Sequence, residues 1–183
     1  MDWWIILIIV VVLIVLYIIS VYNSLVSLRN KVKDQYSQID VELKRRFDLI
    51  PNLVETVKGY TKHEKETLEG VIKARNSYVS ADNLGDQLKA DGELTQAISK
   101  LFALTESYPD LKANTNFMDL QNELSEIEQK IVYARQFYND SVLKLNNKIE
   151  MFPSNLVAKM FNFKKEAFFE AAATERENVK VKF

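Results

Sequence analysis

The feature that most constrains this chain is an unbroken apolar stretch close to its N-terminus. Residues 3–19 read WWIILIIVVVLIVLYII, and no charged residue occurs between Asp2 and Arg29. A helix needs roughly 20 apolar residues to cross a hydrocarbon core about 30 Å thick, and the stretch from Trp3 to Tyr22 has that length. We therefore expect residues 1–23 to form a transmembrane anchor in a lipid bilayer.

Two other classes of segment also place apolar residues near an N-terminus. A cleaved signal peptide would have a basic leading region, a shorter apolar run and a small-x-small cleavage site. A buried helix of a soluble protein would have a polar face, and residues 3–19 offer nothing polar around the circumference. Because the sequence has none of these features, both alternatives are disfavoured.

Aromatic residues mark both ends of the apolar stretch, as they do at membrane–water interfaces. Trp3 and Trp4 are predicted at one interface, and Tyr17 and Tyr22 at the other. Basic residues follow the stretch but do not precede it: Arg29, Lys31, Lys33, Lys44, Arg45 and Arg46. By the positive-inside rule we expect the rest of the chain on the cytoplasmic side, since an exported body would need positive charge before the span.

Composition disfavours several classes of function. The chain has 24 Lys and Arg against 25 Asp and Glu, so it lacks the basic excess of a broad nucleic-acid binder. It has no cysteine and one histidine, His63, and Thr67 stands where a zinc protease motif would have its second histidine. The four glycines are too dispersed for a phosphate-binding loop. We expect no catalytic residues, no metal, no cofactor and no nucleic-acid partner.

Heptad spacing predicts an all-α fold. Only four Gly and three Pro occur in 183 residues, so the helices are long. The clearest one is expected over residues 114–151, where apolar residues recur every seven positions: Phe117, Leu124, Ile131, Tyr138, Leu145 and, just beyond, Phe152. The pattern indicates an antiparallel four-helix bundle with coiled-coil-like packing, continuous with the transmembrane helix.

The remaining helices of this bundle, residues 24–173, follow from the same spacing. The first is expected over residues 24–81, kinked but not ended at Pro51, because the apolar phase continues through Val57, Leu68 and Val71. The second is expected over 85–108 and is broken by Pro109, and the fourth over 153–173 with Pro153 in its first turn. Residues 174–183 form a charged tail that is expected to fray.

Helix lengths lead to a hypothesis of self-association. The first bundle helix would span about 85 Å and the second only about 36 Å, which leaves part of the first helix's apolar stripe without a partner. A neighbouring subunit would then cover it, giving a homo-oligomer. The candidate contact residues are Leu25, Leu28, Val32, Tyr36, Ile39 and Leu43, with Phe163, Phe168 and Phe169 of the fourth helix.

The string KRRFDLIPNLV, residues 44–54, has two interpretations that the sequence leaves open. One is a kinked core helix with charged flanks. The other is a docking surface for a partner, because a kink exposes carbonyls and basic residues bind phosphate or carboxylate. The candidate docking residues are Arg45, Arg46, Asp48, Pro51 and Asn52. The strings VIKARNSY and IVYARQFY, residues 71–78 and 131–138, resemble each other and place Arg75 and Arg135 at matching positions. The two arginines could bind one anion together, but ion pairs with nearby glutamates are favoured.

Three longer strings resemble the LemA family. They are YNSLVSLRNKVKDQYSQIDVELKRRFDLIPNLVETVKGYTKHEKETLE from Tyr22, YPDLKANTNFMDLQNELSEIEQKIVYARQFYN from Tyr108, and NLVAKMF from Asn155. The resemblance implies a single N-terminal transmembrane helix, a following antiparallel bundle of long helices, and no established catalytic residue. It also implies a bacterial inner-membrane protein, since its members look like bacterial membrane proteins, some encoded near a membrane zinc protease.

These observations favour a non-enzymatic, membrane-anchored scaffold that self-associates on the membrane surface and organises or shapes membrane. A second hypothesis is an adaptor or regulatory subunit of another membrane protein, such as a membrane zinc protease. A third is a small-molecule sensor, which needs a polar-lined cavity between the bundle helices.

Overall fold

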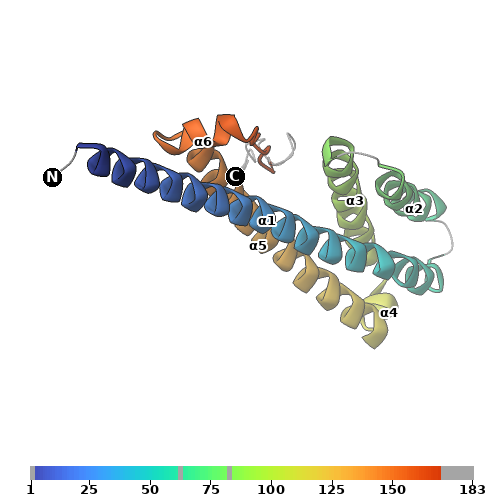
Figure 1. Cartoon of the computed structure of the whole chain (residues 1–183). Helices are drawn as coiled ribbons and strands as arrows, with labels where there is room; N and C mark the ends of the chain where they lie inside the picture. Colours follow the sequence, from blue (N-terminus) through green and yellow to red (C-terminus); the bar gives the residue numbers. More distant parts are fainter. Residues whose placement is uncertain (1–2, 62–63, 82–83, 170–183) are drawn as a thin grey trace, which may run out of the picture. The chain divides into compact units, whose positions relative to one another are not determined.

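The computed structural model describes residues 3–61, 64–81 and 84–169, and these residues form helices and connections without a strand (Figure 1). The expected all-α class is confirmed. The helices are α1 (Trp3–Lys58), α2 (Lys65–Val79), α3 (Leu84–Thr105), α4 (Pro109–Lys112), α5 (Thr115–Glu150) and α6 (Ser154–Met160). The predicted tail, residues 174–183, lies outside the described part of the chain.

The chain divides into two compact units, and α1 and α5 each contribute to both. The first unit consists of Met1–Asp40 and Val132–Phe169. It therefore holds the N-terminal part of α1, the C-terminal part of α5, and α6. The second unit contains Val41–Ile131, which includes the C-terminal part of α1, helices α2, α3 and α4, and the N-terminal part of α5.

Helix α1 ends at Lys58, so the prediction of one helix over residues 24–81 is wrong. Pro51 lies inside α1 and does not end it. The chain instead turns after Lys58, where the backbone N–H groups of Tyr60 and Thr61 both donate to the Val57 carbonyl, at 3.0 and 3.1 Å. The Thr61 hydroxyl donates to the same carbonyl at 3.1 Å, which offers the backbone an alternative to the helix.

Two side-chain hydrogen bonds tie this turn to the connections around α4, all within the second unit. Asn114 Nδ2 donates to the Tyr60 hydroxyl at 2.8 Å, and the Tyr108 hydroxyl donates to Glu64 Oε1 at 3.3 Å. Asn114 also caps α5, because its Oδ1 accepts the backbone N–H of Phe117 at 3.0 Å. One residue thus fixes both the start of α5 and the turn after α1.

Helix α6 ends at Met160, so the prediction of a fourth helix over residues 153–173 is also wrong. Asn162 adopts a positive φ of 54°, a conformation that asparagine tolerates better than most residues. The N–H groups of Asn162 and Phe163 then donate to the carbonyls of Lys159 and Ala158, at 3.2 and 2.9 Å. This is the Schellman arrangement that closes a helix, and residues 163–169 continue without helical structure. We call them the extended segment.

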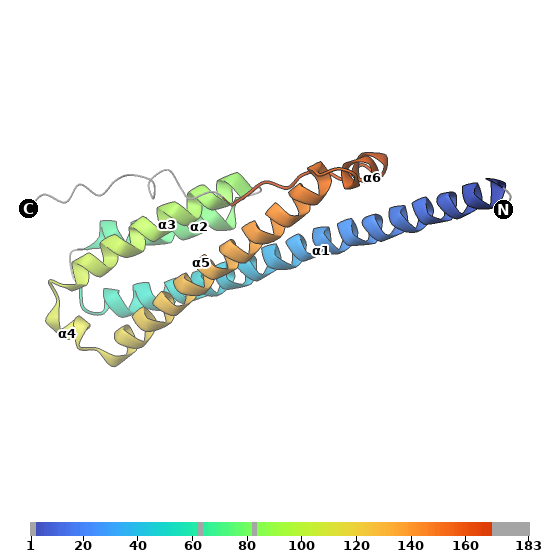
Figure 2. The same ribbon diagram turned by 90° about the vertical axis from the view of Figure 1, so that its left-hand side faces the viewer.

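In the first unit, α5 runs alongside α1 in the opposite direction, and α6 follows at the end of α5 (Figures 1 and 2). Buried apolar side chains come from each part of this unit: Val21, Leu25, Val32 and Ile39 of α1, Tyr138, Val142 and Leu145 of α5, Val157 and Ala158 of α6, and Phe169. The heptad positions predicted for α5 supply Tyr138 and Leu145. The apolar period of α5 therefore determines which of its faces is buried.

The second unit has its own core, in which α2 packs along α3. Phe47 of α1 stacks on Tyr78 of α2 with ring centres 4.0 Å apart, and Phe102 of α3 meets Phe117 of α5 edge-on at 6.2 Å. Leu94 and Leu101 of α3 are fully buried. These aromatic and leucine contacts join all the long helices of the unit around one core.

Candidate functional site

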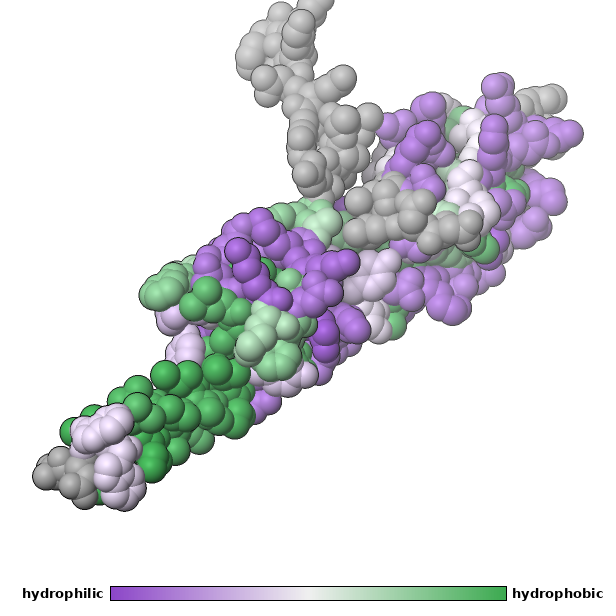
Figure 3. All heavy atoms as spheres, turned by 45° about the horizontal axis from the view of Figure 1, so that its top comes forward, coloured by the Kyte–Doolittle hydropathy of each residue, from purple (hydrophilic) through white to green (hydrophobic). Residues whose placement is uncertain are grey.

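The N-terminal part of α1 exposes apolar side chains on every side. Ile5, Ile8, Leu13 and Ile19 are among them, with exposed fractions between 36% and 60%. Figure 3 shows this part as a continuous hydrophobic surface, whereas the rest of the view is mixed. Among the described helices, only α1 is long and apolar enough to cross a membrane. This finding fits a membrane protein.

The four predicted interface residues lie at the ends of this surface. Trp3 and Trp4 are 75% and 52% exposed, and Tyr17 is 41% exposed. Tyr22 is partly covered, because its ring contacts Phe161 at 4.7 Å and Phe163 at 5.9 Å between centres. The apolar surface of α1 therefore ends where residues from the far end of the sequence meet it.

The predicted self-association stripe of α1 is largely buried within the chain, which corrects the premise of that hypothesis. Leu25, Val32, Ile39 and Leu43 are at most 4% exposed, whereas Leu28 and Tyr36 are half-buried. Sequence reasoning compared the first helix only with the short second one. It did not take into account that the C-terminal part of α5 and the residues after it would cover α1 in the first unit.

The three phenylalanines assigned to the same surface have different environments. Phe169 is buried, Phe163 is half-buried and Phe168 is 43% exposed. Phe163 also lies under the guanidinium of Arg29, whose central carbon is 5.2 Å from the ring centre. Because these residues lie after α6 has ended, they do not form the predicted helical stripe.

Two asparagines of α5 hold the extended segment by its main chain. Asn139 donates from Nδ2 to the Phe169 carbonyl at 2.9 Å and accepts the Phe169 N–H on Oδ1 at 2.8 Å. Asn146, seven residues later, makes the same pair with the carbonyl and N–H of Glu166, at 2.9 and 3.0 Å. Each amide thus satisfies both main-chain groups of one residue, as a neighbouring strand would.

An aromatic cluster anchors the end of the segment. The Phe169 ring lies 5.2 Å from Tyr138 and 6.4 Å from Tyr36, and the Arg135 guanidinium carbon lies 5.6 Å from the Phe169 ring centre. The Tyr138 hydroxyl donates to the Ala167 carbonyl at 3.0 Å. Arg135 therefore takes part in a cation–π contact, an interaction that the sequence interpretation did not include.

Burial raises the pKa of two hydroxyls in this cluster. The pKa of Tyr138 lies above its usual 10.0 because of burial first, then the nearby charges of Glu166 and Tyr36. Burial also raises the pKa of Tyr36, and the Asp40 carboxylate adds to the effect. Both groups keep their protons at neutral pH, so the cluster works as packing and hydrogen bonding rather than as an acid or base.

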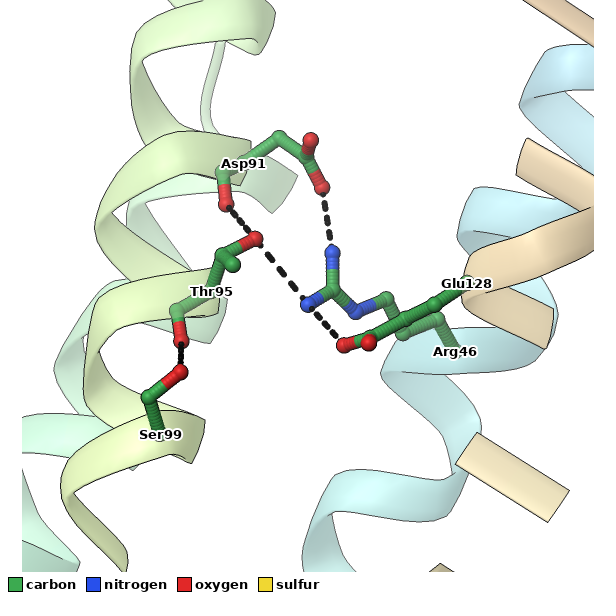
Figure 4. Close-up of polar contacts among 5 residues, drawn as sticks. All are labelled: Arg46, Asp91, Thr95, Ser99 and Glu128. Carbon is green, nitrogen blue, oxygen red and sulfur yellow. Dashed lines mark hydrogen bonds and ion pairs between the residues drawn. The ribbon is translucent and has the colours of Figure 1, made fainter. Parts of the chain in front are cut away.

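Arg46, predicted as a docking residue, is instead the centre of a buried polar cluster in the second unit (Figure 4). It is 2% exposed. Its Nη1 donates to Asp91 Oδ1 of α3 at 2.8 Å, and its Nη2 donates to Thr95 Oγ1 of α3 at 3.1 Å and to Glu128 Oε1 of α5 at 2.9 Å. The guanidinium therefore joins three helices, and it is not available to a partner.

Arg75 replaces the hydrogen bond that Pro51 removes from α1. A proline has no N–H, so the carbonyl four residues earlier, that of Phe47, loses its helical donor. Arg75 Nε of α2 donates to this carbonyl at 3.2 Å, and Nη1 bonds Asn76 Oδ1 at 3.4 Å. Arg75 therefore bonds a backbone carbonyl and an asparagine, rather than forming the ion pair with a glutamate that the sequence favoured. The docking hypothesis assumed that the kink at Pro51 exposes carbonyls. The Phe47 carbonyl instead accepts a hydrogen bond from Arg75 and is not free to bind a partner.

The other predicted docking residues do lie on the surface. Arg45 contacts Glu123 of α5 at 3.4 Å, and Asp48 contacts Lys44 at 2.9 Å, with all four side chains at least 42% exposed. Pro51 and Asn52 are exposed as well. Arg45, Asp48 and Asn52 follow at spacings of three and four residues, so they share one face of α1.

The sensor hypothesis and the metal expectation concern clusters and cavities among the described residues. Within them, no three His, Asp or Glu side chains are grouped so as to hold a metal ion. His63 lies outside the part of the chain that the structure describes. Helices α2 and α3 border a groove of about 630 Å³, lined by polar side chains that include Glu66, Lys73, Glu93 and Lys100. A small-molecule sensor needs a polar-lined cavity, and this groove along α2 and α3 is a polar-lined candidate for it.

Comparison with known proteins assigns the family. The model of the LemA family matches residues 35–183, which is most of the chain. The chain belongs to the LemA family. The match begins within α1, after its apolar stretch, and includes helices α2 to α6.

The proteins that resemble this chain carry two names, LemA and MamQ. Protein LemA of Metamycoplasma hominis is 27% identical over 158 residues, covering 86% of this chain and 72% of that protein. Magnetosome protein MamQ 2 of Paramagnetospirillum magneticum is 25% identical over 175 residues, covering 81% of this chain and 64% of that protein. MamQ of Magnetospirillum gryphiswaldense is 24% identical with the same coverage. The chain thus spans less than two thirds of the MamQ proteins it matches.

Sequence reasoning did not identify Asn139, Asn146 or Asp91, whose side chains form hydrogen bonds between distant parts of the chain. Asn139 and Asn146 carry a signal, because each directly follows a heptad position and they are seven residues apart. Asp91, 5% exposed, carries none, because a single aspartate in an amphipathic helix is expected on the outer face. Its contact with Arg46, 45 positions away in sequence, accompanies its burial.

Proposed function

We propose that this chain is a non-enzymatic, membrane-anchored helical scaffold that self-associates at the membrane surface. The observation that carries the proposal is the change of character along α1. The helix is exposed and apolar on all sides up to Ile19, and from Val21 onward it buries one stripe within the chain. A helix built in this way fits lipid around its first part and protein against its second.

The same proposal places the bundle on the cytoplasmic side of a bacterial inner membrane. The basic residues that follow α1's apolar part, with Arg29 first, support this orientation. The chain has no cysteine, so Ser37→Cys, at an exposed position of α1, gives a single reactive thiol. A membrane-impermeant maleimide should label this cysteine only after the cells are permeabilised. Labelling in intact cells would show that the bundle lies on the outer side of the membrane and would refute the proposed orientation.

The surface that best supports self-association is an exposed apolar patch on α5. Val132, Tyr133 and Phe137 are 61%, 59% and 57% exposed. Tyr133 and Phe137 lie four residues apart and therefore stand on one side of the helix. Clustered aromatic residues on a surface are typical of protein–protein contacts. Anchoring in a membrane confines neighbouring chains to one plane, which raises their effective concentration.

Mass photometry of the full chain in detergent or nanodiscs tests this patch. The wild-type chain should show species larger than a monomer, and Tyr133→Glu with Phe137→Glu should shift them to the monomer. Val79→Glu is a matched control, because Val79 is 67% exposed and lies on α2 in the second unit. A wild-type chain that is monomeric at all concentrations would refute self-association.

An adaptor for another membrane protein is the second candidate, supported by the exposed charged face of α1. Arg45, Asp48 and Asn52 form this face, and their neighbour Arg46 does not. Arg45→Glu with Asp48→Lys should abolish co-purification of a partner while the circular dichroism of the bundle stays unchanged. Co-purification of nothing but the chain itself would reject the adaptor.

A further inference from the structure

Helix α6 and its flanking residues expose a stripe of large apolar side chains. Phe152, Leu156 and Met160 are 80%, 60% and 59% exposed. Leu156 and Met160 lie four residues apart and therefore share one face of α6, whereas Phe152 lies in the turn directly before the helix. Val157 and Ala158, on the other face, are at most 4% exposed. The element therefore packs Val157 and Ala158 within the unit and still leaves large apolar side chains exposed on its outer side.

Contacts within the first unit place this element at the end of the apolar part of α1. The Phe161 ring, directly after α6, lies 4.7 Å from the ring of Tyr22, and Phe163 lies 5.9 Å from it. Tyr22 is the last residue of the stretch that has the length of a membrane span. In Figure 3, green and purple residues are interspersed where the continuous green surface ends. The exposed stripe of α6 thus stands beside the point where α1 would leave the hydrocarbon.

The charges around the stripe are mainly positive. Residues 148–165 contain four lysines, Lys148, Lys159, Lys164 and Lys165, and a single acidic residue, Glu150. Lys165 pairs with Glu150, and Lys159 and Lys164 are exposed. An apolar face with lysines beside it is the pattern of helices that lie in the interface of membranes with anionic lipids.

We propose that α6 is a second membrane contact, which inserts Phe152, Leu156 and Met160 into the lipid–water interface of the leaflet where α1 emerges. The lysines then contact anionic lipid phosphates. Lipid is the occupant that the geometry favours, because the stripe adjoins the boundary of the span and large apolar side chains are costly to expose to water. The inference rests on the proposed membrane attachment of α1, and it makes the chain touch the bilayer at two places far apart in sequence.

Quenching by lipid-borne nitroxides tests the proposal on the full chain in vesicles. Leu156→Cys is labelled with an environment-sensitive fluorophore. One set of vesicles contains lipids with a nitroxide near the headgroup, and a second set contains lipids with a nitroxide deep in the acyl chain. Ser37→Cys is the control, since Ser37 is exposed on α1 about 22 Å beyond Tyr22 along the helix axis. Val11→Cys, within the apolar stretch, reports on the span itself. Phe152→Cys provides a second position in the stripe.

The expected result is quenching at residues 156 and 152 at least about threefold stronger than at residue 37, with a blue-shifted emission, and stronger in anionic than in zwitterionic vesicles. Quenching at residue 11 but not at 156 or 152 would overturn the inference and leave the span intact. Absence of quenching at residue 11 by the deep nitroxide would refute the membrane attachment instead. A blue shift at 156 that grows with the protein-to-lipid ratio, without quenching, would show a second copy on the stripe and also overturn the inference.

Discussion

Replacing Arg46 by methionine should destabilise the second unit strongly. Arg46 and its partner Asp91 are both almost fully buried, with side chains 3% and 7% exposed. Methionine fills a similar volume but leaves the Asp91 carboxylate in the core without its arginine. Breaking a buried pair from one side costs about 3–5 kcal/mol. A domain of this kind is stable by about 5–15 kcal/mol, so the loss is a large part of the total.

Two further variants of the cluster should differ from Arg46→Met in their loss of stability. Arg46→Met combined with Asp91→Leu removes both charges, and an apolar pair in such a place is often neutral, so the double variant should recover about 2–3 kcal/mol of the loss. The buried Nε of Arg46, which has no hydrogen-bond partner in the described residues, favours this recovery. Glu128→Gln should cost less than about 1 kcal/mol, because the Glu128 side chain is 44% exposed.

Urea unfolding of the full chain in detergent, followed by helical circular dichroism, measures these values. The reasoning fails if Arg46→Met costs less than about 1 kcal/mol, since a buried pair cannot be broken so cheaply. It also fails if the double variant loses as much as the two single variants together. Either outcome would show that the pair of Arg46 and Asp91 does not stabilise the second unit as argued.

Three further predictions concern α1, α5 and the aromatic cluster. Arg75→Met should lower the free energy of unfolding by about 1–3 kcal/mol, because the partly buried Phe47 carbonyl loses its donor. In a Pro51→Ala background, where a backbone N–H returns, urea unfolding should show a smaller loss, and equal losses would contradict the prediction. Asn139→Ala should cost about 1–3 kcal/mol and speed amide hydrogen exchange in residues 166–169, so unchanged exchange there would argue against the main-chain hydrogen bonds. Because folding raises the pKa of Tyr138 above 10.0, its contribution to stability is fully present below about pH 10 and is lost as pH rises through the folded pKa. Tyr138→Phe should therefore show a shallower fall in stability at alkaline pH than the wild type, and parallel curves would remove Tyr138 as the cause.

The interior of the long helices could be predicted from sequence, because their period is a local property. The observed α5, Thr115–Glu150, lies within one residue of the predicted 114–151 at each end. Asn114 and Pro153 supply sequence signals at both boundaries. The heptad residues of α5 between Phe117 and Leu145 are buried as predicted.

The helix ends were harder to predict, because apolar phase can continue across a break. Val57, Leu68 and Val71 keep the same phase, although a turn separates the first from the other two. The turn is decided by hydrogen bonds to the Val57 carbonyl, and the end of α6 by the backbone conformation of Asn162. Neither is visible in a pattern of apolar residues.

The polar cluster could not be predicted at all, because its members are distant in sequence. Arg46 is separated from Asp91 by 45 positions and from Glu128 by 82. A charged triplet on a helix is expected to be solvated, and only the tertiary fold distinguishes Arg46 from the exposed Arg45. The burial of a single arginine therefore depends on where two other helices pack.

The way in which α5 holds the extended segment has a consequence for which substitutions the segment can accept. Asn139 and Asn146 contact main-chain atoms, which every residue carries, so the docking of residues 166–169 does not depend on most of their side chains. Phe169 is the exception, because its ring is buried. Substitutions at Ala167 or Phe168 should therefore be tolerated structurally. The segment can therefore accept other outward-facing side chains while its path over α5 is retained.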